Sequence, residues 1–239
     1  MNVVPNRFAG KLALVTGAGR GIGRAIAIAL AKSGCEVCLT GRSLDQLSGV
    51  QADIQALAGK ASVVQADLTR DDDLRSLIQT CGPVDFLINN AGWGKRAPVV
   101  RARVDDWDQT FRLNLRAPMI LAKELLPAMI KKREGAVINI GSVSGKSGEA
   151  NGAAYSASKF GLIGFTQSLY EEVREQGIKV AVILPGFVDT PMIPPVGHLD
   201  RSKMIQANDV AATVVFVLQA GPTVCPVEIM LRPQRTPYR

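Results

Sequence analysis

Short apolar runs alternate with longer amphipathic stretches along the whole chain. This alternation is typical of βαβ units, in which helices connect the parallel strands of one sheet. Most of the short runs are apolar at nearly every position, as strands buried on both faces should be. The predicted strands are residues 11–17, 36–41, 61–67, 84–90, 135–142, 178–186 and 226–233.

The stretches between the strands carry helical patterns, which begin near Gly21, Ser43, Arg70, Val104, Ala153 and Asn208. In one of them Asp71, Asp72 and Asp73 follow Thr69, where carboxylates stabilise the first turn of a helix. We therefore interpret this acidic run as structural and expect no metal site. No repeat or linker divides the chain, so we expect a single domain over residues 1–239. Its fold class is α/β, a doubly wound parallel sheet of about seven strands with helices on both faces.

One long stretch, residues 190–206, contains three prolines and a glycine, which prevent a regular helix across it. Connections of this length are usually lids or binding loops, so we expect a substrate-binding loop here. The alternative is a disordered excursion on the surface.

The composition narrows the class of protein. The chain has 239 residues, of which 47% are hydrophobic, and a net charge of +7. The basic residues are scattered and aromatic residues make up only 5%, which argues against nucleic-acid binding and leaves an anionic small molecule to explain the charge. There is no run of eighteen apolar residues and no signal-peptide layout, so we expect a cytoplasmic protein that does not bind membranes.

The cysteines and the single histidine give little sign of metal or redox chemistry. Cys35 and Cys38 have C-x-x-C spacing, but they lie in a predicted strand, which places the thiols on opposite faces. A redox pair normally opens a helix, so we interpret both as small buried side chains. His198 has no partner at metal-ligand spacing.

A glycine-rich turn, TGAGRGIG, connects the first strand to a helix. The spacing Gly17-x3-Gly21-x-Gly23 differs from the G-x-G-x-x-G fingerprint of dinucleotide-binding proteins, but the strand, turn and helix context is the same. Glycine allows positive φ and close approach of the backbone, so the helix N-terminus presents free N–H groups. The turn predicts a pyrophosphate site.

The end of the second strand bears on the choice of cofactor. An acidic residue there would select the ribose hydroxyl of NAD, whereas this chain has Gly41 and Arg42. Arg42, with Arg20 of the glycine turn, would pair with a 2′-phosphate, which favours NADP. The alternative for Arg42 is a solvated cation at a helix start.

Polar residues close the third and fourth strands. Asp67 would accept a hydrogen bond from an adenine amino group or, equally naturally, cap the turn that follows it. The sequence INNAG, residues 88–92, ends an apolar strand with two amides, which we expect to tie strand ends together or to line the cofactor.

A tyrosine and a lysine stand four residues apart in AAYSASKFG. On a helix Tyr155 and Lys159 share one face, and a nearby ammonium would lower the phenol pKa from about 10. The pair would then act as a general acid for carbonyl reduction. Ser142 ends the fifth strand at the same edge of the sheet and would hold the developing oxyanion. The alternative is an exposed helical pair without function.

With these motifs in order, the chain resembles the short-chain dehydrogenase/reductase family. The resemblance rests on TGAGRGIG, NNAG, Asn114 in LNL, Ser142, the Y-x-x-x-K of 155–159 and the PG-x-x-x-T of 185–190, and it covers essentially the whole chain. It implies a Rossmann-like fold, nicotinamide-dependent oxidoreduction and a homotetramer or homodimer.

By the same resemblance, Tyr155 is the acid/base, Ser142 orients the carbonyl, Lys159 holds the nicotinamide ribose and Asn114 holds a relay water. Pro185 would set the turn in which Gly186, Val188 and Thr190 contact the nicotinamide end. The full set of expected cofactor-binding residues is Gly17, Arg20, Gly21, Ile22, Gly23, Arg42, Asp67, Leu68, Asn90, Ala91, Gly92, Tyr155, Lys159, Pro185, Gly186, Val188 and Thr190.

The residues expected around the substrate are largely apolar, namely Trp93, Ser144, Phe187, Met192 and Ile193. A neutral ketone or acyl chain is therefore favoured. The pattern is similar to that of 3-oxoacyl-(acyl carrier protein) reductases, and Lys131–Arg133 would dock an acidic carrier protein, although cations also stabilise a last helical turn. The ending PVEIMLRPQRTPYR departs from the glycine-rich end typical of those reductases, so a generalist carbonyl or alcohol oxidoreductase is an alternative.

Two further alternatives remain at this stage. One is an NAD(H)-dependent alcohol or hydroxysteroid-type dehydrogenase that works in the oxidative direction. The other is a catalytically silent nucleotide-binding regulator, which the presence of Tyr155, Ser142 and Lys159 together disfavours.

Overall fold

The computed structural model describes residues 7–193 and 199–238 of the chain. Its strands are β1 (Leu12–Thr16), β2 (Glu36–Gly41), β3 (Ala61–Gln65), β4 (Phe86–Asn89), β5 (Gly135–Ile140), β6 (Ile178–Pro185) and β7 (Glu228–Leu231). They form one parallel sheet in the order β3-β2-β1-β4-β5-β6-β7. The order reverses between β1 and β4, and ligands of open α/β sheets bind beyond the carboxyl ends of strands at such a switch point.

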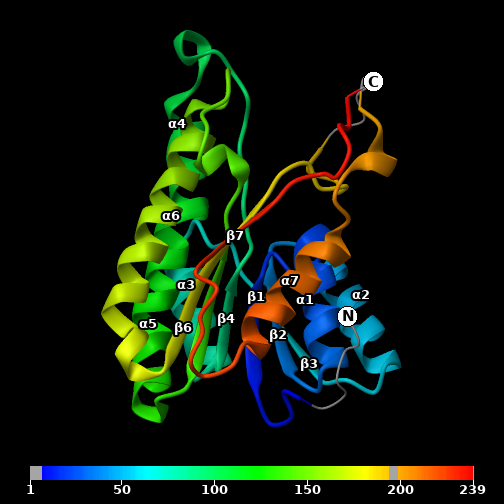
Figure 1. The fold of residues 1–239 in the computed structure, drawn as a ribbon, viewed down its shortest axis with the longest axis vertical. Coiled ribbons are helices and arrows are strands. Elements are labelled where there is room, and N and C mark those ends of the chain that lie inside the picture. The colour runs from blue at the N-terminus through cyan, green and yellow to red at the C-terminus, as the bar shows by residue number, and fades with distance from the viewer. Residues whose placement is uncertain (1–6, 194–198, 239) are drawn as a thin grey trace.

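Helices cover both faces of the sheet, which confirms the expected doubly wound α/β class (Figure 1). One face carries α1 (Gly21–Lys32), α2 (Leu44–Ala56) and α7 (Ala207–Gln219). The other carries α3 (Asp71–Cys81), α5 (Ala117–Lys132) and α6 (Ala153–Val173), with α4 (Val104–Phe111) packed against α6. Short 3₁₀ turns lie at η1 (Val99–Arg101), η3 (Val143–Gly145), η4 (Arg174–Gln176) and η5 (Arg201–Lys203).

Successive residues of each central strand point to opposite faces and so build two cores. Leu14 of β1 packs with α3, α5 and α6, while its neighbour Val15 packs with α1, α2 and α7. Cys35 and Cys38 divide between the same two cores, as their strand position predicts, and both are free thiols. The edge strands β3 and β7 are partly exposed, so they are less apolar than the others.

The strands are shorter than predicted where polar residues take over at their ends. At the end of β3, Asp67 accepts from the backbone N–H of Thr69 at 3.0 Å, which turns the chain away from the sheet. Asp71 to Asp73 occupy the first turn of α3, as predicted, with Arg70 as the N-cap residue. None of the helices in the described part of the chain is long and apolar enough to cross a bilayer.

The helical pattern that begins at Val104 is not one helix. A π-helical turn, η2 (Arg112–Arg116), separates α4 from α5 and contains Asn114. π turns leave extra backbone polar groups locally, and they are frequent at functional sites. The apolar periodicity runs through this turn without a break, so the pattern alone does not reveal it.

Candidate active site

The turn between β1 and α1 has the backbone that a pyrophosphate requires. Gly17 and Gly21 adopt φ of +64° and +55°, where a side chain would strain the backbone. A Cβ on Gly23 would lie 2.2 Å from the Gly17 carbonyl oxygen, so the turn packs directly on the first turn of α1. No side chain caps this helix, and its first turn contains no acidic residue. Its N-terminal N–H groups therefore face the turn without a competing carboxylate, which fits an anionic phosphate.

Thr16 and Asn90 join this turn to the end of β4. The Thr16 hydroxyl accepts from the backbone N–H groups of Asn90 and Ala91, both at 2.9 Å. In return the Asn90 amide donates to the carbonyl oxygens of Thr16 at 2.9 Å and Gly17 at 3.2 Å. Asn90 thus ties strand ends together, one of the two roles expected of it. Gly92 follows, and a Cβ there would meet Asn114 Oδ1 at 3.6 Å and Lys159 Nζ at 3.7 Å.

Asn114 and Lys159 are both buried beside this strand end, at 1% and 3% exposure. Asn114 Nδ2 donates to the Trp93 carbonyl at 2.8 Å and to the Ser158 hydroxyl at 3.0 Å, and its Oδ1 accepts from Trp93 N–H at 2.9 Å. The amide therefore fixes the segment that follows β4. Lys159 Nζ donates to the Ile140 carbonyl at 2.8 Å, at the end of β5.

Tyr155 lies in the first turn of α6, where its ring meets both Lys159 and Ser142. Lys159 Nζ is 5.8 Å from the ring centroid, and the Ser142 hydroxyl lies close enough to the phenol to lower its pKa. Ser142 is 8% exposed, directly beyond β5. A Cβ on Gly94 would lie 2.6 Å from Tyr155 Cδ2, so the absence of a side chain there leaves room for the ring. The structure brings together all four residues of the expected catalytic set.

The expected lowering of the Tyr155 pKa by Lys159 is wrong. Burial raises the pKa of Tyr155 above its ordinary value and outweighs the Ser142 hydrogen bond, which lowers it. Burial also lowers the pKa of Lys159 to about 8. The reason is that removing both groups from water disfavours their charged forms, and Lys159 directs its ammonium to a backbone carbonyl. The phenol is thus held as an acid at neutral pH.

Arg20 and Arg42 lie on the surface near the glycine turn, and neither guanidinium pairs with a carboxylate of the described residues. Gly41, at the end of β2, lies close to Gly17, since a Cβ on Gly41 would be 4.0 Å from Gly17 Cα. Asp67 Oδ1 accepts from Thr69 N–H and from the Thr69 hydroxyl at 2.8 Å, so the local capping role is the one observed. Leu68 is buried in the core.

The segment after β6 returns to the glycine turn. Pro185 closes β6, Gly186 N–H donates to the Leu231 carbonyl at 2.8 Å, and Val188 pairs with Ile205 in a parallel bridge. A side chain on Gly21 would meet the Thr190 methyl at 3.3 Å, which brings the two ends of the expected cofactor site together.

Arg201 anchors the described part of residues 190–206. It forms an ion pair with Asp189 and donates to the carbonyls of Thr190 and Ile193, both at 3.1 Å. Residues 194–198, including His198, lie outside the described residues. The 3₁₀ turn η5 is the regular structure observed in the rest of the segment, consistent with its prolines.

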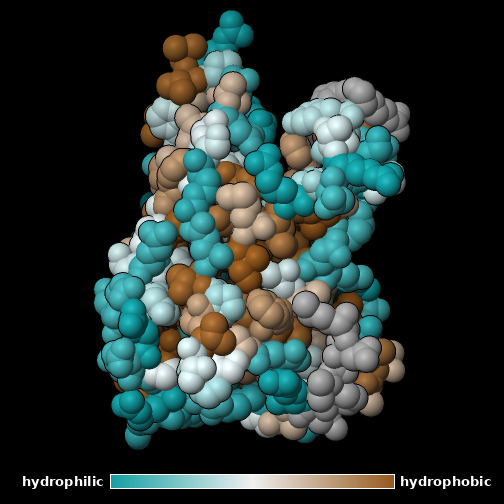
Figure 2. Space-filling model, viewed as in Figure 1, coloured by the Kyte–Doolittle hydropathy of each residue, from teal (hydrophilic) through white to brown (hydrophobic). Residues whose placement is uncertain are grey.

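The residues expected around the substrate differ in their exposure and in their contacts. The Phe187 ring stacks edge-on against Tyr238 at 5.5 Å, Trp93 and Ile193 are half-buried, and Met192 is 59% exposed. Ser144 is buried, and its hydroxyl donates to Glu149 at 2.8 Å, so it is not a free substrate ligand. The surface is hollowed between the arm formed by α4 and the arm formed by η5 and the C-terminal tail, with apolar side chains at its base (Figure 2).

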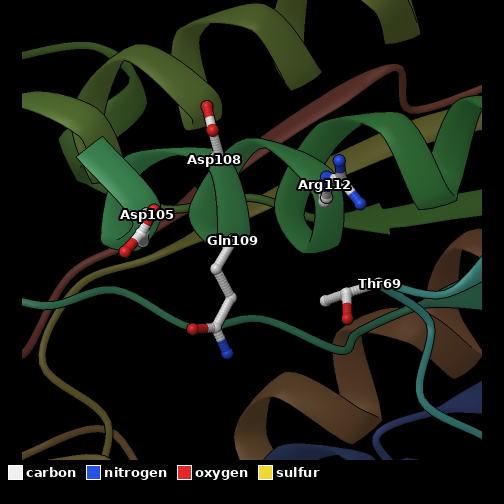
Figure 3. Close-up of a pocket in the computed structure, with 5 residues that line it drawn as sticks. All are labelled: Thr69, Asp105, Asp108, Gln109 and Arg112. Atoms are coloured by element: carbon white, nitrogen blue, oxygen red, sulfur yellow. The ribbon is translucent and has the colours of Figure 1, made fainter. Parts of the chain in front are cut away.

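Two hollows have defined linings. One of about 260 Å³ lies between α4 and the turn after β3 and is lined by Thr69, Asp105, Asp108, Gln109 and Arg112 (Figure 3). None of these was expected in the site. The other, of about 520 Å³, lies between residues 202–205 and 231–235. Leu231, which lines it, also accepts the hydrogen bond from Gly186 N–H.

Two further expectations concern metal ligands and the basic cluster Lys131–Arg133. Across residues 7–193 and 199–238, no group of three or more His, Cys, Asp or Glu side chains is placed to hold a metal ion. Lys132 pairs with Asp85 at 3.1 Å, and Arg133 donates to the Glu175 carbonyl at 3.0 Å. Only Lys131 of this basic cluster lacks a partner within the described structure.

Sequence reasoning missed Thr16, Gly94, Arg96, Glu149 and Arg201. Thr16 precedes the glycine turn, and a buried threonine at a strand end is a usable signal for a hydroxyl that bonds to neighbouring backbone. Gly94, Arg96 and Glu149 act through contacts between segments far apart in the chain, and Arg201 acts by folding one loop back on itself, neither of which a local pattern reveals.

The comparisons with known proteins agree with this geometry. Residues 11–199 match the model of the family described as short chain dehydrogenase. An uncharacterized oxidoreductase of Staphylococcus aureus is 37% identical over 227 residues, which span 93% of this chain and 97% of that protein. The 3-oxoacyl-[acyl-carrier-protein] reductase of Escherichia coli is 41% identical over 223 residues, 88% of this chain and 90% of that enzyme.

Solved structures share the fold over nearly the whole chain. A metagenomic short-chain oxidoreductase in complex with NADP superposes with a TM-score of 0.83 at 34% identity, covering 96% of this chain and 99% of that one. A 3-oxoacyl-[acyl-carrier protein] reductase from Brucella melitensis gives a TM-score of 0.88 at 26% identity, covering 96% and 92%. This chain belongs to the short-chain dehydrogenase/reductase family of oxidoreductases.

Proposed function

We propose that the protein reduces a ketone carbonyl with NADPH, with Tyr155 as the general acid. The observation that carries the proposal is the convergence of Tyr155, Ser142 and Lys159 at the carboxyl edge of the sheet, beside the glycine turn. The proton-donating phenol and the phosphate-binding turn therefore both lie near the switch point of the sheet, where α/β proteins bind ligands. A nicotinamide dinucleotide bound there would supply the hydride.

Each residue of the set has a role that its position supports. Tyr155 donates its phenolic proton to the carbonyl oxygen, and Ser142 donates a second hydrogen bond that orients the same oxygen. Lys159 holds the nicotinamide ribose, and Ser142 stabilises the phenolate left behind. Asn114 fixes the strand end next to Lys159 through Trp93, and the relay water proposed for it would use the space beside Gly92.

The raised pKa of Tyr155 favours the reductive direction. Reduction needs the protonated phenol, which is present below its pKa, whereas oxidation of an alcohol needs the phenolate. The alternative function, an NAD(H)-dependent alcohol or hydroxysteroid-type dehydrogenase, would require a lower pKa in the bound state. Burial therefore keeps Tyr155 in the protonated form that reduction uses.

The choice of NADP rests on the unpaired guanidiniums of Arg20 and Arg42 and on the lack of an acidic residue at the end of β2. A similar oxidoreductase of solved structure binds NADP. The proposed cofactor contacts also include Gly17, Gly21, Ile22, Gly23, Asp67, Leu68, Asn90, Ala91, Gly92, Pro185, Gly186, Val188 and Thr190.

The substrate proposed is a 3-oxoacyl thioester or a similar apolar ketone, which suits the apolar side chains at the base of the cleft and the resemblance to 3-oxoacyl reductases. An acyl carrier protein is the proposed partner in the thioester case. With Lys132 and Arg133 held internally, Lys131 is the remaining cation of that cluster for such docking. We propose a homotetramer or homodimer as the assembly.

The test is a steady-state assay of NADPH and NADH oxidation with a panel of ketones and a 3-oxoacyl thioester. We expect turnover with NADPH on at least one apolar ketone, and we expect Arg42→Asp to weaken NADPH far more than NADH. Equal losses for both cofactors would contradict the NADP proposal. Nucleotide binding without turnover on any substrate, in either direction, would favour the silent regulator instead.

A further inference from the structure

Two loops flank Tyr155 and are tied to each other. Residues 93–98 follow β4, and residues 146–152 precede α6. Their backbones join where Ala97 N–H donates to the Asn151 carbonyl at 2.9 Å, and Arg96 forms a hydrogen-bonded ion pair with Glu149 across the same gap. The loops therefore approach Tyr155 as one connected unit, whose link carries a positive and a negative charge.

A line of hydrogen bonds leads from this ion pair to Ser142. Glu149 Oε1 accepts from the Ser144 hydroxyl at 2.8 Å, and Ser144 N–H donates to Ser142 Oγ at 3.1 Å. Ser144 is only 5% exposed, so its hydroxyl has no ready supply of water in place of Glu149. With one lone pair of Ser142 engaged in this way, its own proton is free to point toward the phenol and the carbonyl of a substrate.

The charged and titratable groups around Tyr155 come from three segments. Lys159 lies one turn along its own helix, Glu149 lies in the loop before that helix, and Arg96 lies in the loop after β4. The negative charge of Glu149 raises the pKa of Tyr155 and the positive charge of Arg96 lowers it, both less strongly than burial does. The two partners of one ion pair thus act on the phenol in opposite directions.

We propose that Glu149 and Arg96 are positioning residues of the active site, which fix the Ser142 hydroxyl through Ser144 and set the balance of charge around Tyr155. This inference rests on the proposed function of Tyr155 and Ser142. Neither residue touches the reacting atoms. An exposed ion pair contributes little to stability, and here the side chains are 65% exposed for Arg96 and 36% for Glu149. A purely structural role therefore predicts small effects that do not depend on the sign of the charge removed.

Three variants separate charge from structure. Glu149→Gln removes the negative charge and keeps an oxygen that accepts from Ser144. Arg96→Met removes the positive charge, and Lys95→Met is the matched control. Lys95 is the neighbour of Arg96 and carries the same charge, but it pairs with Asp106 of α4 at 3.1 Å instead.

The first measurement is a titration of the tyrosinate absorbance, which needs neither substrate nor cofactor. The chain has three tyrosines, so subtracting the titration of the matching Tyr155→Phe protein isolates the Tyr155 signal. We expect this signal to move to lower pH in Glu149→Gln and to higher pH in Arg96→Met, and to stay in place in Lys95→Met. Because Arg96 is well exposed, its variant tests the charge effect even if the Glu149 variant folds poorly.

The second measurement is the pH profile of ketone reduction. We expect the loss of activity on the alkaline side to move in the same directions as the titration. Ser144→Ala should lower kcat roughly two- to tenfold, the effect of one lost hydrogen bond, without moving the profile. Movement of both charge variants in one direction, or an equal movement in Lys95→Met, would overturn the inference. A parent enzyme that reduces no ketone would instead overturn the proposed function, while the titration still decides the effect of the charges.

Discussion

Replacing Lys159 with methionine should make the protein more stable at neutral pH while abolishing its activity. The side chain is 3% exposed, and burial lowers its pKa from 10.5 to about 8. Because one pKa unit equals 1.36 kcal/mol, this difference corresponds to about 3 kcal/mol by which the fold disfavours the charged form. Methionine is similar in length and carries no charge, so the variant escapes that penalty.

The loss of one hydrogen bond offsets part of the gain. Lys159 Nζ donates to the Ile140 carbonyl at 2.8 Å, and such a bond contributes about 1 kcal/mol. The net expectation is about 2 kcal/mol of added stability below pH 8, or roughly 4 to 8 °C in Tm for a chain of this size.

The stability difference between Lys159→Met and the parent should depend on pH. Below pH 8 the lysine is charged in both the folded and the unfolded protein, and the penalty applies in full. Between pH 8 and 10.5 the folded protein gives up the proton first, so the parent gains stability as pH rises through this window. Lys159→Met should lack that gain, and the two Tm curves should converge toward pH 10.5.

The assay is thermal unfolding of parent and variant from pH 6 to 10, with NADPH oxidation measured on the same samples. Lys159→Arg is the control, because it keeps the charge and should not gain stability. A methionine variant that is less stable than the parent at pH 7, or a constant Tm difference across the range, would refute the reasoning. Either result would mean that the buried ammonium is stabilised by its surroundings.

Three further changes follow from contacts in the site and the core. Gly94→Ala should displace the Tyr155 ring, because the new methyl would lie 2.6 Å from Cδ2, and misplacement of about 1 Å lowers kcat roughly 100-fold. Thr16→Val should lower the free energy of unfolding by about 2 kcal/mol or more in denaturant titrations, since its hydroxyl accepts from two backbone N–H groups. Asp85→Asn should lower Tm at pH 7, because it removes a carboxylate that is hydrogen-bonded to Leu12 N–H and to Lys132. These interactions outweigh burial and hold the pKa of Asp85 below its ordinary value. That loss should shrink as pH falls below about 4, where Asp85 of the unfolded chain takes up a proton, and should vanish below the depressed pKa of the folded protein.

Controls for these changes lie in the same molecule. Gly164→Ala, on the same helix as Tyr155, has nothing within 4 Å of the added methyl and should leave kcat unchanged. Thr16→Ser keeps the hydroxyl and should retain most of the stability. A parental kcat in Gly94→Ala would contradict the role given to Gly94, and parental stability in Thr16→Val would contradict the role given to the Thr16 hydroxyl. A Tm difference between Asp85→Asn and the parent that does not shrink in acid would contradict the pairing of Asp85.

The sequence was sufficient for the fold, and the four residues expected to be catalytic lie close together in it. Buried strands such as residues 135–140 and the glycine turn are local patterns with one structural solution, so their positions follow directly. The spacing of Tyr155 and Lys159 was equally local, since a helix places them on one face. Ser142 and Asn90 then lie at the same edge of the sheet, as parallel topology requires.

What the sequence could not supply depends on burial and on contacts between distant segments. The pKa of Tyr155 has the opposite direction to that expected, because desolvation exceeds the influence of Lys159, and the degree of burial is a tertiary property. The π turn at Asn114 keeps the apolar periodicity of its neighbours and so leaves no mark in the pattern. The bond between Ser144 and Glu149 depends on how one loop folds back, which composition does not determine.

The central claim is that Tyr155 delivers the proton to the carbonyl while the glycine turn holds the cofactor independently. The most direct measurement is Tyr155→Phe, with the Kd for NADPH and kcat for a ketone determined on the same preparation. The account predicts an NADPH Kd close to that of the parent and a kcat at least about 100-fold lower, as expected for the loss of one general acid. A phenylalanine variant that turns over at the parental rate would contradict it.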